Sequence, residues 1–477
     1  MNKDATLSRT TRIAYGFGLS AEGIKNTAFN AFLLFFYQQV VGLDPLWCGA
    51  ALFIALCWDA VTDPAVGVWS DGVRSRLGRR HPFMFAAGLP LALCFFAVFN
   101  PPRSLSQPWL FAWLVFFACA TRFAMTLFVI PHASLVAELA SDYDERTKLQ
   151  SLRTVFGWMF GLINSVLAYR VFLRPTPEYE IGLLNAEGYV KFSIFGAVVM
   201  LIATQLSSAG TLRHTLAVRP PSAASPSSTL RELPGAIATV LRNRNYRVVV
   251  GMGLCGAVSF GMLENLGNYI NTYFWGLNTK QLAIFIAVIF FASLVVLVII
   301  GPLTRRFNKR NVAIGAAIIT ACNNPIMVSL KLLGVLPPNG SRELLIVLSI
   351  AVFVGYLSVI ITMIMTGAMI ADITDEHELT TGTRQEGLLF SAVALIAKAS
   401  SGLGVMLASG MVKLVGFPDK ANPSTLDPDI SRNLAIFLAT NIFILGTLAI
   451  WIARNYQLGR HEHAQILEQL AVQRTSA

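Results

Sequence analysis

Charged side chains are scarce in this chain, and their scarcity excludes a water-soluble globular protein. Asp, Glu, Lys and Arg make up 13% of the 477 residues and hydrophobic residues make up 55%, whereas soluble domains carry about 25% charged residues. The apolar runs reach about 20 residues or more, which is long enough for an α-helix to cross a bilayer. Ten-residue segments of alternating polarity, typical of membrane β-barrels, are lacking. The sequence therefore predicts an all-α integral membrane protein.

Patterns that signal metal binding, disulfides or nucleotide binding are also lacking. The six cysteines are scattered, mostly inside apolar runs, without metal-ligand spacing or a disulfide framework. No P-loop or HExxH pattern occurs, and GMGLCG (251–256) fits G-x-G-x-x-G only inside an apolar span without a preceding strand. The start of the chain, MNKDATLSRTTRIAYGFG, shows no cleavage site after a short apolar core. We therefore expect no enzyme and no resident cofactor, and a first helix that stays in the mature protein.

The positive charge of the chain is distributed in short clusters between the apolar runs. The net charge is +11, but clusters of this kind are what the positive-inside rule expects of cytoplasmic loops, so we do not expect nucleic-acid binding. The clusters on one side contain Arg9, Arg12, Arg74, Arg76, Arg79, Arg80, Arg146, Lys148, Arg242, Arg244, Arg247, Arg305, Arg306, Lys309, Arg310, Arg454 and Arg460. We therefore place both termini in the cytoplasm of a plasma membrane, the inner membrane of a bacterium.

Hydropathy predicts about twelve membrane-spanning segments in two halves. The predicted segments are 12–41, 45–70, 82–100, 108–136, 149–174, 187–210, 247–275, 280–303, 311–333, 342–371, 385–415 and 431–455. The Pro- and Ser-rich stretch VRPPSAASPSSTLRELPG follows the sixth segment and is typical of a linker. The prediction is a six-helix half at 1–210, a cytoplasmic linker at 211–246, and a second six-helix half with a cytoplasmic tail at 247–477.

The two predicted halves share a repeated loop. GVWSDGVRSRLGRR follows the second segment and GPLTRRFNKRN follows the eighth. Each begins at a glycine and ends in a basic cluster, at matching positions of the two halves. Paired six-helix halves are the construction of transporters of the major facilitator type. The sequence therefore predicts a major facilitator fold.

Two aspartates lie inside the second apolar segment, in WDAVTDPAVGVW. A carboxylate in hydrocarbon costs roughly 2.5–3.5 kcal/mol on insertion scales, so an acid inside the membrane indicates function. Asp59 and Asp63 share one helix face at i and i+4, about a dozen residues from the basic loop. A carboxylate pair with nearby hydroxyls suits Na⁺, which prefers oxygen ligands, and a like-charge pair also suits H⁺. The pair predicts a site for one of these two cations.

Longer motifs resemble one transporter family. WDAVTDPAVGVWSDGVRSRLGRRHP (58–82) is similar to the second-helix signature of the glycoside–pentoside–hexuronide:cation symporters, the melibiose permease family. The resemblance returns at 15–18, 37–43, 130–153 and 371–402, and so covers essentially the whole chain. Lysolipid transporters of the wider group carry a Pro-His segment like Pro131-His132. The resemblance implies uptake of a substrate coupled to Na⁺ or H⁺ by alternating access.

The resemblance also implies roles for single residues. The cation site would comprise Asp59, Thr62, Asp63 and Thr126. Lys398 of the eleventh helix and Arg153 at the start of the fifth match residues that contact substrate. A charge network that closes the cytoplasmic side matches Asp372, Glu378 and Arg384, to which we add Arg76 and Arg79 of the basic loop.

The substrate site departs from the family pattern. Gly23 and Val129 occupy positions where melibiose permease carries acids that contact the sugar. Other polar side chains are candidates instead: Glu22 and Asn26 in the first helix, and Glu264, Asn268 and Tyr269 in the seventh. Glu264 and Asn268 share a helix face suited to a hydroxyl-rich ligand, although contacts between helices would explain the same pattern.

The sequence thus predicts a cation-coupled symporter of a sugar or glycoside. The alternative is a transporter of an amphiphile such as a lysophospholipid, and a receptor without transport is a further alternative from a different class. We expect a monomer in the bilayer, with a small molecule as its substrate. A long lateral cleft with apolar walls would favour the amphiphile, and a closed polar cavity would favour the sugar.

Overall fold

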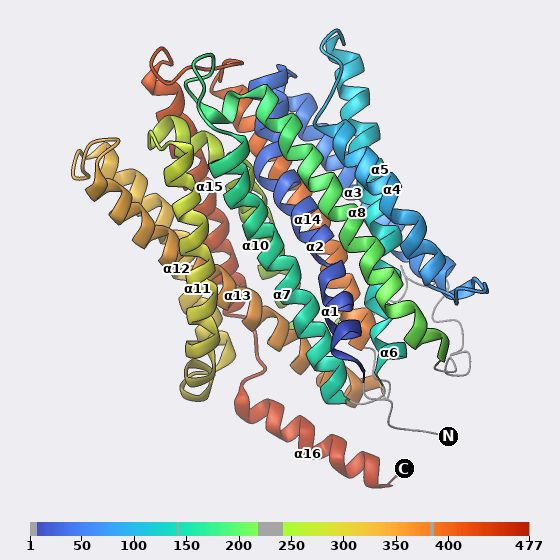
Figure 1. Cartoon of the computed structure of the whole chain (residues 1–477). Helices are drawn as coiled ribbons and strands as arrows, with labels where there is room; N and C mark the ends of the chain where they lie inside the picture. Colours follow the sequence, from blue (N-terminus) through green and yellow to red (C-terminus); the bar gives the residue numbers. More distant parts are fainter. Residues whose placement is uncertain (1–6, 141–142, 218–241, 382–385, 477) are drawn as a thin grey trace. The chain divides into compact units, whose positions relative to one another are not determined.

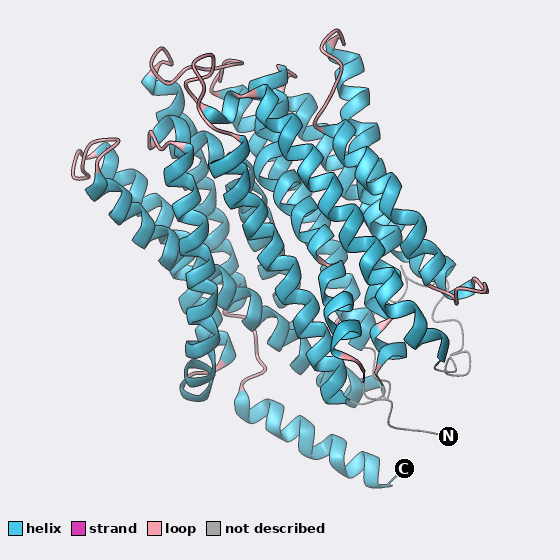
Figure 2. Cartoon of the chain, in the orientation of Figure 1, coloured by secondary structure: helices cyan, strands magenta, loops and turns pink. Residues whose placement is uncertain are grey.

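The apolar runs of the sequence fold as helices joined by short loops (Figures 1 and 2). The computed structural model describes residues 7–140, 143–217, 242–381 and 386–476, and no strand occurs among them. Helices satisfy every backbone hydrogen bond within one segment, which a chain in hydrocarbon requires. The predicted fold class, an all-α membrane protein, is confirmed.

The first part of the chain holds the helices up to residue 217. They are α1 (Arg9–Gly18), α2 (Ser20–Thr27), η1 (Ala28–Leu33), η2 (Phe36–Val41), α3 (Pro45–Gly72), α4 (His81–Val98), α5 (Gln107–Ser134), α6 (Val136–Leu139), α7 (Tyr143–Leu167), η3 (Ala168–Phe172), η4 (Gly182–Leu184) and α8 (Ala186–Ala217). Of these, η1, η2 and η3 are π-helical and η4 is a 3₁₀ turn.

The remaining helices follow residue 242. They are α10 (Arg244–Tyr269), η5 (Ile270–Phe274), α11 (Thr279–Arg306), α12 (Lys309–Leu332), α13 (Arg342–Thr381), α14 (Glu386–Leu414), α15 (Pro428–Ala453) and α16 (Arg460–Ser476). Helix α16 lies beyond the predicted spans and contacts α13. Figure 1 shows it in red at the C-terminal end of the chain.

Eleven helices in the described ranges are long and apolar enough to cross a membrane. The predicted first span, 12–41, is not among them because it is divided into α1, α2 and two π-helical segments. Its polar residues, which include Glu22 and Lys25, also lower its hydropathy. The segment is nevertheless helical over almost all of its length.

The chain divides into two compact units. The first comprises Met1–Leu230, Asn278–Ala283 and Pro418–Asn422, and the second comprises Arg231–Leu277, Ile284–Phe417 and Pro423–Ala477. The predicted boundaries at 210 and 247 stay a prediction. Most of the predicted linker, 218–241, lies outside the described residues, while its two ends belong to α8 and α10.

The N-terminal ends of α3 and α5 are joined by hydrogen bonds. Asp44 caps α3 by accepting a hydrogen bond from the Leu46 amide at 2.9 Å. The backbone N–H of Asp44 also donates to Gln107 Oε1 (3.0 Å), and Gln107 Nε2 donates to the Gly42 carbonyl (2.7 Å). Because Gln107 is the first residue of α5, the two helices start side by side and pack along each other. Residues at equal depth in α3 and α5 therefore meet.

Candidate functional site

Asp59 forms an ion pair with an arginine that lies inside the membrane-spanning part of α5. Arg122 Nη1 is 2.6 Å from Asp59 Oδ2, and the two side chains are only 7% and 6% exposed. Both residues lie near the middle of helices of 28 residues. Neither can reach a membrane surface at 1.5 Å of rise per residue. Asp59, which was predicted to bind a cation, thus already contacts a cationic side chain of the protein itself.

Asp63 meets α5 one turn further along. Thr126 Oγ1 donates to Asp63 Oδ1 at 2.8 Å. Both contacts between α3 and α5 join residues 63 positions apart, as expected of two parallel helices that start in register. Two of the predicted cation-site residues, Asp63 and Thr126, are therefore in direct contact.

Phe29 contacts the Asp59–Arg122 pair, and Thr62 lies on the same helix as Asp59. The guanidinium of Arg122 lies over the ring of Phe29 in η1, 5.3 Å from its centroid, a distance at which a cation is attracted to the ring face. Thr62, also predicted for the cation site, is buried, and its hydroxyl donates to the Trp58 carbonyl at 3.0 Å. The oxygen of Thr62 keeps its capacity to accept a hydrogen bond or bind a cation.

The first helix contacts α7 backbone to backbone at Gly23. A Cβ on Gly23 would lie 1.9 Å from the Gly157 carbonyl oxygen, far inside van der Waals contact. No side chain fits at this position, which explains why an acid is lacking there. Of the predicted substrate residues on α2, Glu22 is half-buried and Asn26 is exposed.

Three other positions named from the sequence are placed as follows. Val129 packs against an apolar cluster that contains Tyr15 and Phe128, so this position contributes to the core. Arg153 is buried on α7 at 8% exposure, in the first unit. Lys398 is half-buried on α14, in the second unit. The substrate roles of Arg153 and Lys398 stay predictions.

The polar residues of the seventh helix lie on α10, and two of them, Glu264 and Tyr269, contact other residues of the second unit. Glu264 accepts a hydrogen bond from the Tyr356 hydroxyl of α13 at 2.8 Å. Tyr269 is buried and meets the Phe417 ring edge-on, with centroids 5.3 Å apart. Asn268 is also buried, at 3% exposure. Helix packing therefore accounts for part of this pattern, as the alternative explanation expected.

The predicted gate residue Asp372 has an unforeseen partner on α12. Lys309 Nζ lies 2.7 and 2.8 Å from its two carboxylate oxygens. His463 of α16 lies 3.5 Å from Asp372 and 3.0 Å from Asp375, which attaches the last helix to α13. Glu378 is half-buried, and Arg384 lies outside the described residues.

The two gate residues of the basic loop differ in their contacts. Arg79 Nη2 is 3.1 Å from Glu138 Oε1, and Arg80 contacts the same oxygen at 3.4 Å. Arg76 is exposed and forms no ion pair with any residue in the described ranges. The loop after α3 is thus held to α6 by Arg79 and Arg80.

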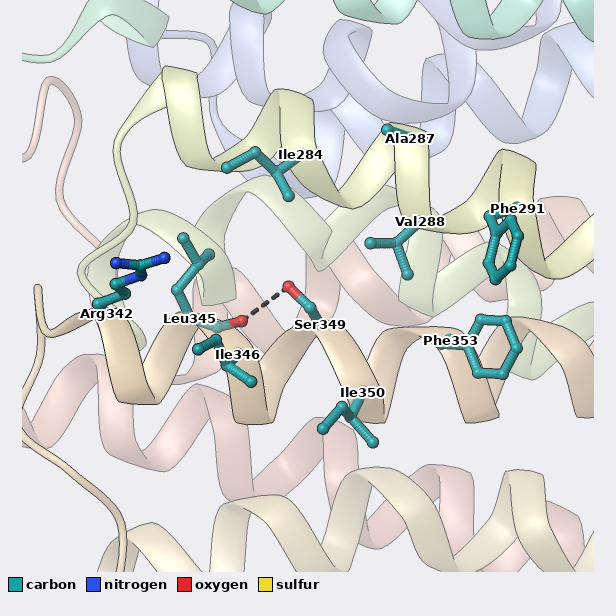
Figure 3. A pocket seen from close by; sticks show the side chains of 10 residues that line it. All are labelled: Ile284, Ala287, Val288, Phe291, Arg342, Leu345, Ile346, Ser349, Ile350 and Phe353. Carbon is teal, nitrogen blue, oxygen red and sulfur yellow. Dashed lines mark hydrogen bonds between the residues drawn. The ribbon is translucent and has the colours of Figure 1, made fainter.

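One groove in the second unit is unrelated to the predicted sites. It has a volume of about 620 Å³ between α11 and α13, and all but two of its lining side chains are apolar. Figure 3 shows Arg342 at one end and Phe291 with Phe353 at the other; the two rings are 5.9 Å apart. None of its lining residues was predicted to bind substrate.

The sequence-based prediction omitted Arg122. The criterion that identified Asp59, a lone charge inside an apolar run, applies equally to Arg122 in ACATRFAMTLF.

Within the described ranges, no group of three or more His, Cys, Asp and Glu side chains could hold a metal ion. A monovalent cation would therefore need ligands from other residue types, such as Thr62 and Thr126.

Sequence comparison places the chain among transporters. A family model described as MFS/sugar transport protein matches residues 14–460. An uncharacterized symporter of Synechocystis, sll1374, is 26% identical over 97% of this chain and 96% of its own length. The isoprimeverose transporter of Lactiplantibacillus pentosus is 24% identical over 82% and 78%. The sodium-dependent lysophosphatidylcholine symporter 1-B of Danio rerio is 22% identical over 94% and 87%.

Solved structures show the same fold at low sequence identity. A mutant of the nucleoside transporter NupG superposes with a TM-score of 0.63 at 12% identity, over 93% of this chain and 98% of its own. A bacterial homologue of the lysosomal transporter Spinster gives 0.61 at 12% identity, over 96% and 97%. These relatives are membrane transporters and not enzymes. The chain therefore belongs to the MFS/sugar transport protein family, as a symporter-type member of the major facilitator superfamily related to the glycoside–pentoside–hexuronide:cation symporters.

Proposed function

We propose that the protein is a symporter that couples the entry of a sugar or glycoside to Na⁺ or H⁺. The observation that carries the proposal is the pair of contacts between α3 and α5, which places two carboxylates, a guanidinium and a threonine together inside the membrane span, with Asp59, Arg122 and Thr126 buried. Charges at such depth are costly and are retained for a function. The sugar is favoured by the family and by the isoprimeverose transporter among the relatives.

The proposed mechanism uses the cation to neutralise charge at Asp63. Asp63 adds a second carboxylate to the site, and a charged carboxylate opposes burial in a closed state. A cation bound there removes this penalty, so that closure around the substrate becomes favourable only when both are present. Asp372, which was predicted to help close the cytoplasmic side, is paired with Lys309 of the same unit.

The test uses purified protein in proteoliposomes and two substitutions, Asp59→Asn and Asp63→Asn. Isoprimeverose and melibiose serve as sugar probes, with an imposed Na⁺ or H⁺ gradient. The wild type accumulates its substrate above the outside concentration, and both variants only equilibrate it. Asp429→Asn is the matched control, because Asp429 is 59% exposed and has no place in the mechanism. Undiminished accumulation in both variants contradicts the proposal.

A second candidate substrate is a lysophospholipid. The groove between α11 and α13 is lined by apolar side chains except for Ser349 and, at one end, the cationic Arg342, a combination that fits an acyl chain and a phosphate. Relatives from Danio rerio and Gallus gallus are sodium-dependent lysophosphatidylcholine symporters, the latter 22% identical over 99% of this chain. Uptake of lysophosphatidylcholine, and of neither sugar, in the same proteoliposomes would favour this candidate.

A further inference from the structure

Arg122 compensates the charge of Asp59 with a cation that cannot leave the protein. Its guanidinium lies 2.6 Å from the carboxylate, and both side chains are almost fully buried. An arginine remains protonated at any physiological pH and offers only donors, no acceptor. The positive charge of Arg122 is therefore not transported, whichever ion is transported with the substrate.

The guanidinium of Arg122 also occupies a carboxylate oxygen of Asp59 that Na⁺ would need as a ligand. Na⁺ is a hard cation that takes oxygen ligands, and Asp59 Oδ2 already accepts a hydrogen bond from Arg122 Nη1. A second cation at this carboxylate would lie next to the guanidinium and be repelled by it. One turn away, Asp63 accepts a hydrogen bond from the hydroxyl of Thr126. With Asp59 bound to Arg122, Na⁺ lacks the second carboxylate that a site made of both aspartates would offer.

The position of Arg122 is fixed by its surroundings. Arg122 lies near the middle of α5, one turn before Thr126, and both residues face α3. The Phe29 ring lies against the guanidinium, with its centroid at 5.3 Å. An arginine that belonged to the lipid interface would instead extend its side chain to a membrane surface. The ion pair is therefore part of the site.

We propose that Arg122 is a built-in counter-cation that takes the place of Na⁺ at Asp59, so that Na⁺ binding at this aspartate and the Arg122–Asp59 ion pair exclude each other. The inference rests on the proposed coupling site, and it adds which residue determines the kind of cation that the site binds. It makes Arg122 a residue that sets cation specificity, and it predicts that a neutral side chain at position 122 creates a Na⁺ requirement absent from the wild type.

The test measures thermal unfolding of the purified full chain in NaCl and in KCl of equal ionic strength, without substrate. A ligand that binds only the folded state raises its apparent stability. The wild type is expected to unfold at the same temperature in both salts. Arg122→Gln is expected to unfold about 1–3 °C higher in NaCl than in KCl. If the substitution only weakened the structure in general, it would lower the unfolding temperature equally in NaCl and in KCl.

Three further variants control the result. Arg122→Met provides a second neutral side chain of adaptable shape, should Arg122→Gln not be recovered folded. Arg122→Lys keeps the charge and is expected to behave as the wild type. The double variant Asp59→Asn/Arg122→Gln removes both charges and is expected to lose the response to Na⁺.

Two outcomes overturn the inference. The first is a Na⁺-specific rise in the unfolding temperature of the wild type. The second is an equal unfolding temperature in both salts for the folded neutral variants. Because the measurement needs no transport, its failure is distinct from that of the proposed function, which fails when no probe is accumulated in proteoliposomes.

Discussion

At the scale of single residues, the ion pair of Asp59 and Arg122 resolves an energetic problem posed by the sequence. An isolated buried charge is costly, and two unit charges 4 Å apart attract each other by about 4 kcal/mol at an effective dielectric constant of 20. Each residue therefore makes the other tolerable in the membrane. A buried pair is weak evidence for stability in itself, so its position beside Asp63 is better explained by function.

The stability of the pair can be measured with a double-mutant cycle. Asp59→Asn leaves Arg122 buried without its partner, and this is expected to lower the free energy of unfolding by about 3–5 kcal/mol. The double variant Asp59→Asn/Arg122→Gln removes both charges and is expected to recover most of that loss. Denaturation in detergent compares the wild type with Asp59→Asn, Arg122→Gln and the double variant, and strictly additive effects would show that the pair is not coupled.

The sequence revealed one partner of this pair and not the other. Asp59 and Asp63 could be predicted because acids in an apolar run are rare and their i, i+4 spacing fixes a shared face. Arg122 carries the same signal, but nothing in one sequence tells which face of α3 meets which face of α5. That contact depends on Asp44 and Gln107, which fasten the two helix starts together.

At the scale of helices, the first span is shaped by close contact with α7. Gly23 and Gly161 of the two helices also approach closely, because a Cβ on Gly161 would lie 3.1 Å from the Gly23 carbonyl oxygen. Small residues allow membrane helices to pack at such short distance. The resemblance to melibiose permease places Gly23 where that protein carries an acid, and the helix contact supplies a physical reason why no larger side chain stands there.

Substitution of Gly23 tests this contact. Gly23→Ala places a methyl group against the Gly157 carbonyl and is expected to lower stability by about 1–3 kcal/mol, as overpacking does. Gly67→Ala on α3 is the matched control, since its Cβ would lie 3.7 Å from Ile130 Cγ2, an ordinary contact distance. Equal unfolding temperatures for the two variants would contradict the close packing of α2 and α7.

At the scale of the whole molecule, hydropathy was sufficient for the fold class and for most helix positions. Long apolar runs leave few alternatives to helices, because lipid offers the backbone no hydrogen-bond partner. Helix α16 was not predicted, since its polar sequence carries no span signal; its contact through His463 to Asp375 depends on tertiary structure. The sequence did not identify the substrate, because Gly23 and Val129 stand where the resemblance to melibiose permease implies acids that contact a sugar.

The central claim is that movement of substrate is coupled to a cation at the α3–α5 site. The most direct measurement is the uptake of isoprimeverose, melibiose or lysophosphatidylcholine by wild-type proteoliposomes under an imposed Na⁺ gradient, an imposed H⁺ gradient, or neither. The account predicts accumulation above the outside concentration with at least one gradient, and simple equilibration without a gradient. Equal uptake of a transported probe under all three conditions would contradict it, because the substrate would then move without a coupled cation.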